Sequence, residues 1–384
     1  MDVVVIADLQ SGPVELPKVG DVINELPPSV FAVGEIIKGQ DVVKIGEVIK
    51  THYFGATSED VVYLIMGADP KQIMWSGPLP LNERAHQYVK DVAKIPEGPE
   101  RLEFFQKHLE DEDEMIARDA YDEFAKTPYE GVVALRDKMD HEQLLTWIQN
   151  PETPASRRRL YFTMLGVCGS AEDIPLLEGL LTTENREARL GLDAMIACYL
   201  GLAGEDGLPL IDREFLANAE AEYSDTYSAI MAIRFHGNET DVIGRERLVQ
   251  SLQLVLKRPQ LADLVIPDLA RWEDWSVIEE LATLFKVANK DANWVRVPII
   301  NYMRACPEPA AAEAIKRLEE VDPEAVKRAN IFFPFAQFAG GSRNGEDGEE
   351  TSDEATEKTG AGQDATAQEF AQPVPPPDDP VDNG

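Results

Sequence analysis

The residues with the most obvious chemical potential are five consecutive acids, Glu110-Asp111-Glu112-Asp113-Glu114, followed by an alanine-spaced segment typical of a helix. A calcium loop needs alternating Asp or Asn ligands, a glycine in the middle of the loop and a distal glutamate. The acidic run lacks this arrangement. We therefore expect a helix corner, in which Asp111 or Asp113 accepts hydrogen bonds from free N–H groups of the next helix. An incidental cation site is the alternative.

No other group of residues has the spacing of a known catalytic, cofactor or metal site. The sequence contains neither G-x-x-x-x-G-K-[ST] nor G-x-G-x-x-G, which cradle nucleotide phosphates, and it lacks the G-x-S-x-G motif of hydrolases. No two of its five histidines have the spacing of a helical zinc site. We therefore expect no catalytic, cofactor-binding or metal-binding residues. An enzyme with a site around His52, Trp75 and His86, where the first domain meets the second, is the minor alternative.

The charge of the chain limits the classes of partner. Among 384 residues, 70 are acidic and 36 are basic, which gives a formal net charge of −34. A surface of this sign repels nucleic-acid phosphates and anionic lipid, and it favours basic proteins or cations. No apolar stretch approaches the roughly 18–20 residues of a membrane-spanning helix. We expect protein partners, with no nucleic acid and no membrane insertion.

The start of the chain bears on its location in the cell. The first ten residues, MDVVVIADLQ, are strand-like and have neither the basic segment nor the cleavage site of a signal peptide. We therefore expect a cytoplasmic protein, or an extracytoplasmic one if a leader lies upstream of Met1. Three cysteines in a chain of this length do not form a disulfide scaffold.

Residues 1–80 are expected to form a small β domain. Runs of β-branched or apolar residues separated by Gly, Pro and Asp predict strands at 3–9, 30–37, 47–54, 61–67 and 72–76. Five strands in this length suit a barrel of the oligonucleotide/oligosaccharide-binding (OB) shape, and a sandwich is the alternative. The stretch WSGPLPL (75–81) predicts a stiff joint or, alternatively, a polyproline II ligand. Residues 81–98 would complete this joint as a linker helix.

Three of these runs, VVVIADL, VFAVGEIIKG and VVYLIMG, occur in an order similar to that of bacterial netrin/tissue-inhibitor-like OB folds. Members of that branch usually begin with a Cys-x-Cys or Cys-x-x-Cys segment, and they are exported. The first cysteine of this sequence is Cys168, so neither the disulfide nor inhibition through an N-terminal cysteine can be transferred. The resemblance implies, as an alternative function, an exported regulator or inhibitor-like protein acting through its β domain.

From Asn82 to about Asn330 the pattern is helical and repeats about every 36 residues. Three and six residues after each of six aligned positions the residue is uncharged, and these offsets share one helical face. The aligned positions are Arg118, Arg159, Arg189, Tyr227, Leu264 and Arg296. The uncharged positions are Tyr121, Phe162, Leu192, Ile230, Pro267 and Ile299, and then Phe124, Leu165, Met195, Ile233, Ala270 and Tyr302.

Each unit consists of a helix, an acidic or polar corner and a second helix. This arrangement resembles HEAT repeats, in which an Asp or Asn corner precedes a second helix carrying an arginine followed by small and aliphatic residues. The resemblance covers residues 99 to about 330 and implies an α-solenoid. Cys168 and Cys198 each lie nine residues after an aligned arginine, which predicts separate buried thiols in adjacent units. A redox pair is the alternative.

The C-terminal residues differ from the repeats. The segment IFFPFAQF (331–338) has four phenylalanines and is expected to cap the end of the solenoid domain, residues 99–338, or to dock on another chain. Residues 339–384 contain twelve acids and two basic residues, a net charge of −10 that leaves −24 on residues 1–338. This Pro-rich tail has too few apolar residues for a core and is expected to be disordered.

In the middle units the second helices are apolar on the face opposite the aligned columns as well. A helix that is apolar on both sides must be covered. Either other parts of the array cover this face, or it forms a groove for a partner segment. The partner-binding candidates are Met164, Val167, Phe235, Leu269 and Trp272.

These observations predict a multidomain α+β protein, in which a small five-stranded β-barrel precedes an α-solenoid and a disordered acidic tail. Solenoids present long surfaces rather than closed reactive pockets. The expected function is therefore that of a non-catalytic scaffold or protein–protein interaction protein.

Overall fold

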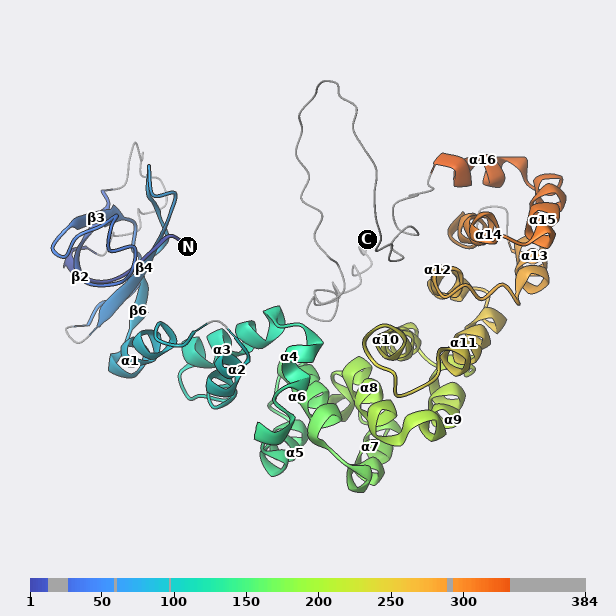
Figure 1. Cartoon of the computed structure of the whole chain (residues 1–384), viewed down its shortest axis with the longest axis horizontal. Helices are drawn as coiled ribbons and strands as arrows, with labels where there is room; N and C mark the ends of the chain where they lie inside the picture. The colour runs from blue at the N-terminus through green and yellow to red at the C-terminus, as the bar shows by residue number, and fades with distance from the viewer. Residues whose placement is uncertain (13–26, 59–60, 97, 289–292, 332–384) are drawn as a thin grey trace, which may run out of the picture. The chain divides into compact units, whose positions relative to one another are not determined.

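The computed structural model describes residues 1–12, 27–58, 61–96, 98–288 and 293–331 (Figure 1). The chain divides into two compact units, Met1–Lys126 and Thr127–Gly384, which are described one at a time. Residues 332–338 of the expected Phe-rich cap and the expected acidic tail, 339–384, lie outside the described residues.

The first unit contains an antiparallel sheet that is nearly closed. The order along it is β3-β2-β1-β4-β5, and β6 also pairs with β4. Register shifts between β1 and β2 are β-bulges, which increase the twist of a strand and so help a sheet to curl. The strands are β1 Val3–Ser11, β2 Ser29–Lys38, β3 Val48–Thr51, β4 Val62–Ala68, β5 Met74–Trp75 and β6 Leu79–Leu81.

The inner face of the sheet carries the core of this unit. Alternate residues of the strands are buried, among them Val5, Phe31, Ile49 and Ile65. The burial alternates because successive side chains of a strand point to opposite faces. The five strands predicted from β-branched and apolar runs are all present. The expected stiff joint at 75–81 differs, because its last residues form β6. Pro80 is tolerated there because β6 is an edge strand that pairs only with β4. A proline in an edge strand can lack its N–H without removing a hydrogen bond between strands.

Three helices complete the first unit: α1 Glu83–Val92, α2 Pro99–Gln106 and α3 Glu114–Lys126. His86 and Lys90 of α1 each lie 3.2 Å from a carboxylate oxygen of Glu35 on β2. On another side of α1, the Tyr88 hydroxyl donates to Asp119 of α3 at 2.9 Å. The helix α1 thus contacts both the sheet and α3, and the first unit extends to Lys126.

The second unit is helical over all of its described length, as the sequence predicted from Asn82 onward. Every second helix packs on the next one of its kind in two runs. In the first run α6 packs on α8 and α8 on α10, and in the second α12 packs on α14 and α14 on α16. In the sequence, α7, α9, α11, α13 and α15 alternate with these helices. The elements are α4 Tyr129–Val133, η1 Arg136–Lys138, α5 His141–Gln149, α6 Ala155–Cys168, η2 Ala171–Asp173, α7 Ile174–Leu181, η3 Glu187–Arg189, α8 Leu192–Ala203, η4 Gly204–Gly207, α9 Leu208–Ile211, η5 Asp212–Leu216, α10 Tyr223–Glu239, α11 Arg245–Gln253, η6 Leu254–Lys257, η7 Ala262–Leu264, α12 Ile266–Arg271, α13 Ile278–Val287, α14 Asn293–Ala305, α15 Pro309–Glu319 and α16 Pro323–Ile331.

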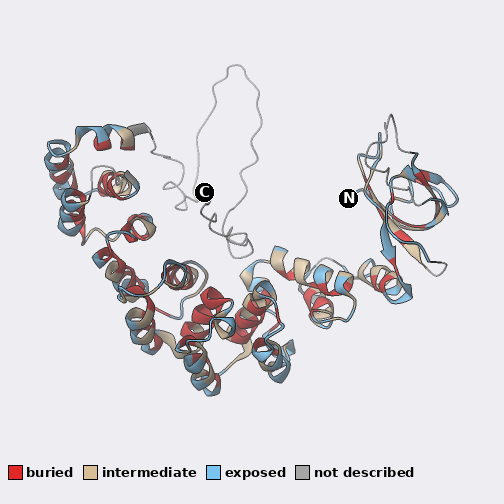
Figure 2. Cartoon of the chain, turned by 180° about the vertical axis from the view of Figure 1, so that it is seen from behind, coloured by how far each residue is buried: buried red, intermediate tan, exposed pale blue. Residues whose placement is uncertain are grey.

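The aligned uncharged positions are buried in the second unit with one exception (Figure 2). Phe162, Leu192 and Ile230 lie in α6, α8 and α10, which pack side by side. Pro267 is exposed instead. It occupies the first turn of α12, where its missing N–H breaks no helical hydrogen bond and the side chain can face solvent.

Ion pairs join successive helical pairs of the second unit at nearly constant sequence spacing. The bonded residues are 34 to 36 positions apart, close to one repeat. We call these the arginine–aspartate pairs: Arg159–Asp193, Arg189–Asp225 and Arg234–Asp268, with N···O distances of 2.8, 2.5 and 2.8 Å. Desolvation offsets much of the attraction in such pairs, but a shifted alignment would leave a charge unpaired. They therefore specify how neighbouring pairs align.

The helix α8 is the most buried element, with every residue from Leu192 to Leu200 buried. Among the described residues, the span Leu192–Leu216 is the one helical stretch long and apolar enough to cross a membrane. Just over half of its most apolar window, 56%, is buried inside the protein. The core helix of a folded domain has this same composition.

Candidate functional site

The acidic run at 110–114 forms the corner before α3, as predicted. The Asp111 carboxylate accepts a hydrogen bond from the N–H of Asp113 at 2.9 Å. The Asp113 carboxylate accepts from the N–H of Met115 at 3.0 Å and from the Asn82 side chain at 2.7 Å. Asp113 is thus the N-cap that satisfies a free donor at the start of α3.

Replacing Asp113 with alanine should destabilise the first unit by about 1–2 kcal/mol, because α3 loses its cap and Asn82 loses an acceptor. Thermal unfolding measures the effect. The exposed neighbour Glu112 is the matched control, and Glu112→Ala should change stability by less than about 0.5 kcal/mol. A calcium-dependent rise in Tm that Asp113→Ala abolishes would instead support the cation-site alternative.

Most of the five partner-binding candidates are buried in the second unit. Met164, Val167, Leu269 and Trp272 are buried, and Phe235 is half-buried. Trp272 lies against Gly237 of α10, and the Arg245 guanidinium is 5.8 Å from its ring centroid. The burial agrees with the alternative in which the chain covers this face itself. Binding of a partner at these residues stays a prediction.

A segment of the chain itself covers part of this face. The Tyr129 ring of α4 packs edge-on against Phe235 of α10, with centroids 4.9 Å apart. Val132 and Leu135, which follow Tyr129 at helical spacing, are buried, and α4 and η1 both pack on α6. Burial, and secondly the nearby Glu130 of α4, raises the pKa of Glu239 in α10. We call Tyr129–Lys138 the α4–η1 strap.

Large apolar and aromatic side chains are exposed near the N-terminal ends of three helices of the second unit. Leu190 precedes α8, Tyr223 begins α10 and Trp294 begins α14, with exposed fractions of 39%, 58% and 57%. The Tyr223 and Tyr227 rings stack with centroids 6.1 Å apart. We call Leu190, Tyr223, Tyr227 and Trp294 the aromatic edge; Tyr227 is half-buried and the other three are exposed. These residues were not predicted, because the aligned positions lie along the middle of each helix. Large apolar residues in the first turn of a helix are the sequence feature that would have indicated them.

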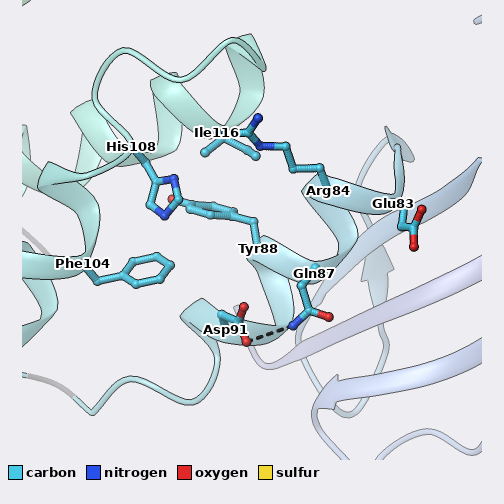
Figure 3. Close-up of a pocket in the computed structure, with 8 residues that line it drawn as sticks. All are labelled: Glu83, Arg84, Gln87, Tyr88, Asp91, Phe104, His108 and Ile116. Atoms are coloured by element: carbon cyan, nitrogen blue, oxygen red, sulfur yellow. Dashed lines mark hydrogen bonds between the residues drawn. The ribbon is translucent and has the colours of Figure 1, made fainter.

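The first unit has a recess of about 400 Å³ beside α1, α2 and α3 (Figure 3). Its wall includes three aromatic rings, those of Tyr88, Phe104 and His108, with mutual centroid distances of 4.8 to 5.7 Å. Asp91 lies across from Phe104, and Ile116 of α3 closes one side. The remaining lining residues are Glu83, Arg84 and Gln87.

Charged groups around the recess are held in hydrogen bonds. Burial alone would raise the pKa of Asp111, but hydrogen bonds from the Asp113 N–H, His108 and Arg84 outweigh it and hold the pKa below the usual value. Burial raises the pKa of Asp119, although the hydrogen bond from Tyr88 opposes this. Burial, reinforced by the Asp119 charge, raises the pKa of the Tyr88 phenol far above its usual range. Tyr88 therefore keeps its proton and remains a hydrogen-bond donor to Asp119.

The three residues around which we considered an enzyme site all lie in the first unit, and an enzyme function there stays a prediction. The His52 ring stacks on Phe54 with centroids 6.1 Å apart, and Trp75 packs against the core of the sheet. His86 is paired with Glu35 and does not line the recess. In the part of the chain that the structure describes, no group of three or more His, Cys, Asp or Glu side chains is placed to hold a metal ion.

The cysteines are free thiols, as predicted for Cys168 and Cys198; Cys198 is buried as expected, whereas Cys168, at the C-terminal end of α6, is only half-buried. Burial raises the pKa of both, and Cys198 is fully enclosed. A raised pKa lowers the thiolate fraction at neutral pH and so lowers reactivity.

Comparisons with known protein families, with curated proteins and with solved structures found no match to this chain.

Proposed function

We propose that residues 127–331 form a HEAT-like α-solenoid and that the protein is a non-catalytic scaffold that binds a partner protein along this solenoid. Three features support the proposal: alternate helices pack in succession, the arginine–aspartate pairs recur near the repeat length, and the aligned positions are buried. In such arrays each repeat contacts mainly its neighbours, which leaves extended surfaces for binding.

The observation that carries the proposal is the aromatic edge. Tyr223 and Trp294 each expose more than half of their surface, at equivalent ends of their helices. Tyr and Trp are enriched at protein interfaces and supply much of the binding energy there. Residues 1–338 carry a net charge of −24, so a partner with basic residues around an apolar contact would be attracted.

We further propose that the nearly closed sheet of the first unit is a small OB-like barrel. Its five-strand path with antiparallel neighbours and its single inward-facing core support this assignment. The netrin-like branch would be a finer version of the same assignment, and the sequence order of the three strand runs is its support.

Site-specific photo-crosslinking tests the binding proposal. A photoreactive phenylalanine analogue replaces Tyr223, Trp294 or, as the control, Val242, which is 51% exposed and lies between α10 and α11. We expect one defined adduct of the same mass from positions 223 and 294 in cells, and none from position 242. Tyr223→Ser combined with Trp294→Ser should abolish that partner's co-purification while circular dichroism stays unchanged. Equal adducts from all three positions, or none from 223 and 294, would contradict the proposal.

A further inference from the structure

The aromatic recess of the first unit has the composition of a cation site. Phe104 and His108 are half-buried, so parts of their rings face the recess, and Tyr88 supplies a third ring behind them (Figure 3). The faces of aromatic rings carry negative electrostatic potential and attract a cation within about 6 Å of the ring centroid. The three rings are in mutual contact, and Phe104 and His108 are the two with partly exposed surface.

A carboxylate faces this wall from α1. Asp91 accepts hydrogen bonds from Gln87 at 3.0 Å and from Lys94 at 2.9 Å, and both are made to Oδ1. The Lys94 and Asp91 side chains are 68% and 42% exposed, so solvent screens this ion pair and makes it weak. The one arginine of the lining, Arg84, is paired with Asp111 at 2.5 Å, which compensates its charge.

We propose that the recess bounded by Tyr88, Phe104, His108 and Asp91 binds a methylated ammonium group. The rings would contact the methyl groups and the positive charge together, and Asp91 would supply the opposite charge. A volume of about 400 Å³ exceeds that of a bare ammonium ion and suits a small ligand with alkyl groups. A guanidinium fits less well, because its five N–H donors require several acceptors and the wall is made of rings.

Two sources could provide this group: a free quaternary amine, or a methylated lysine of a protein. The shared chemistry is tested first, with choline and its uncharged isostere 3,3-dimethylbutan-1-ol as probes and the full chain as the receptor. In a titration followed by NMR of the aromatic side chains, choline should give saturable shifts of the Tyr88, Phe104 and His108 signals. The uncharged isostere should bind at least about tenfold more weakly, because it lacks the charge that the rings and Asp91 recognise.

Two substitutions with matched controls locate the binding. Phe104→Leu should weaken choline binding about tenfold, since it removes one π face. Phe54→Leu, at an exposed residue of the first unit outside the recess, should not change choline binding. Asp91→Asn should weaken it about threefold or more at low salt, and the effect should shrink in 1 M NaCl. Asp41→Asn is the exposed control for charge. If Phe104→Leu unfolds the first unit, Asp91→Asn still tests the proposal, because Asp91 lies at the surface of α1 and its substitution should leave the fold intact.

A second pair of probes separates the two sources. A short peptide with trimethyllysine is compared with the same peptide carrying unmodified lysine and with choline. Tighter binding of the trimethyllysine peptide than of choline supports a protein ligand, and the reverse supports a free amine. Equal binding of choline and its uncharged isostere, shifts that never saturate, or no change in Phe104→Leu and Asp91→Asn would overturn the proposal. The solenoid proposal is untouched by these outcomes, because its crosslinking sites lie in the other unit.

Discussion

Replacing Arg258 with methionine should destabilise the second unit by about 3–5 kcal/mol, a large part of the roughly 5–15 kcal/mol that holds a typical domain folded. Arg258 is 5% exposed. Its guanidinium donates to the Phe215 carbonyl at 3.0 Å, to the Ala221 carbonyl at 2.8 Å and to the Thr226 hydroxyl at 2.7 Å. Methionine fills similar space but leaves these buried acceptors without that donor, and each unsatisfied acceptor is costly.

Urea unfolding followed by circular dichroism measures this loss. Arg258→Lys should recover only part of it, because one ammonium group cannot reach three acceptors placed around a planar fork. Arg213→Met is the control, since the Arg213 side chain is 65% exposed and pairs with the adjacent Glu214. The control should shift stability by less than about 0.5 kcal/mol. A loss below about 1 kcal/mol for Arg258→Met would show that the acceptors find other donors.

Gly237→Ala should destabilise the second unit by about 1–3 kcal/mol, although alanine is normally the better helix residue. Gly237 lies in α10, and a Cβ built there would clash with Cζ2 of Trp272 and be 2.6 Å from its Cη2. The indole cannot retreat easily, because it is 91% buried by its surroundings and Arg245, stacked over it, also donates to the Gly237 carbonyl at 2.7 Å.

Gly179→Ala is the matched control for Gly237→Ala. Gly179 lies inside α7, and a Cβ there would meet nothing within 4 Å, so alanine should stabilise by about 0.5–1 kcal/mol. In a Trp272→Leu background the cost of Gly237→Ala should fall by more than about 1 kcal/mol, because the clashing ring atoms are gone. Equal, stabilising effects at both glycines, measured by urea unfolding, would show that α10 and Trp272 separate without cost.

The local elements of this protein could be predicted from sequence because their signals are local. Runs of β-branched and apolar residues mark β1 and β4, and the acidic run before α3 marks its N-cap. The alignment failed at Pro267, where the repeat is degenerate and the helix is short. The strand β6 was missed because proline usually argues against a strand and only its edge position permits it.

The candidate sites could be predicted less well, because they depend on contacts between distant residues. The apolar second face was found from its pattern, but its cover, the α4–η1 strap, depends on the contact of Tyr129 with Phe235. The recess joins Tyr88 to Phe104 and His108 across two helices, and neither helix alone has a distinctive motif. Such a site follows from the angle at which the helices meet, and residue spacing along one helix does not encode that angle.

The contact of Tyr129 with Phe235 has a consequence for how the second unit comes apart. A row of repeats held only by adjacent contacts can fray from either end, one repeat after another. Because α4 contacts α10 and α6, loosening α10 also removes a neighbour of α4, the first helix of the second unit. The stretch from α4 to α10 should therefore open in a single cooperative step, and amide hydrogen exchange should show one common protection level across it, above that of α13 to α16.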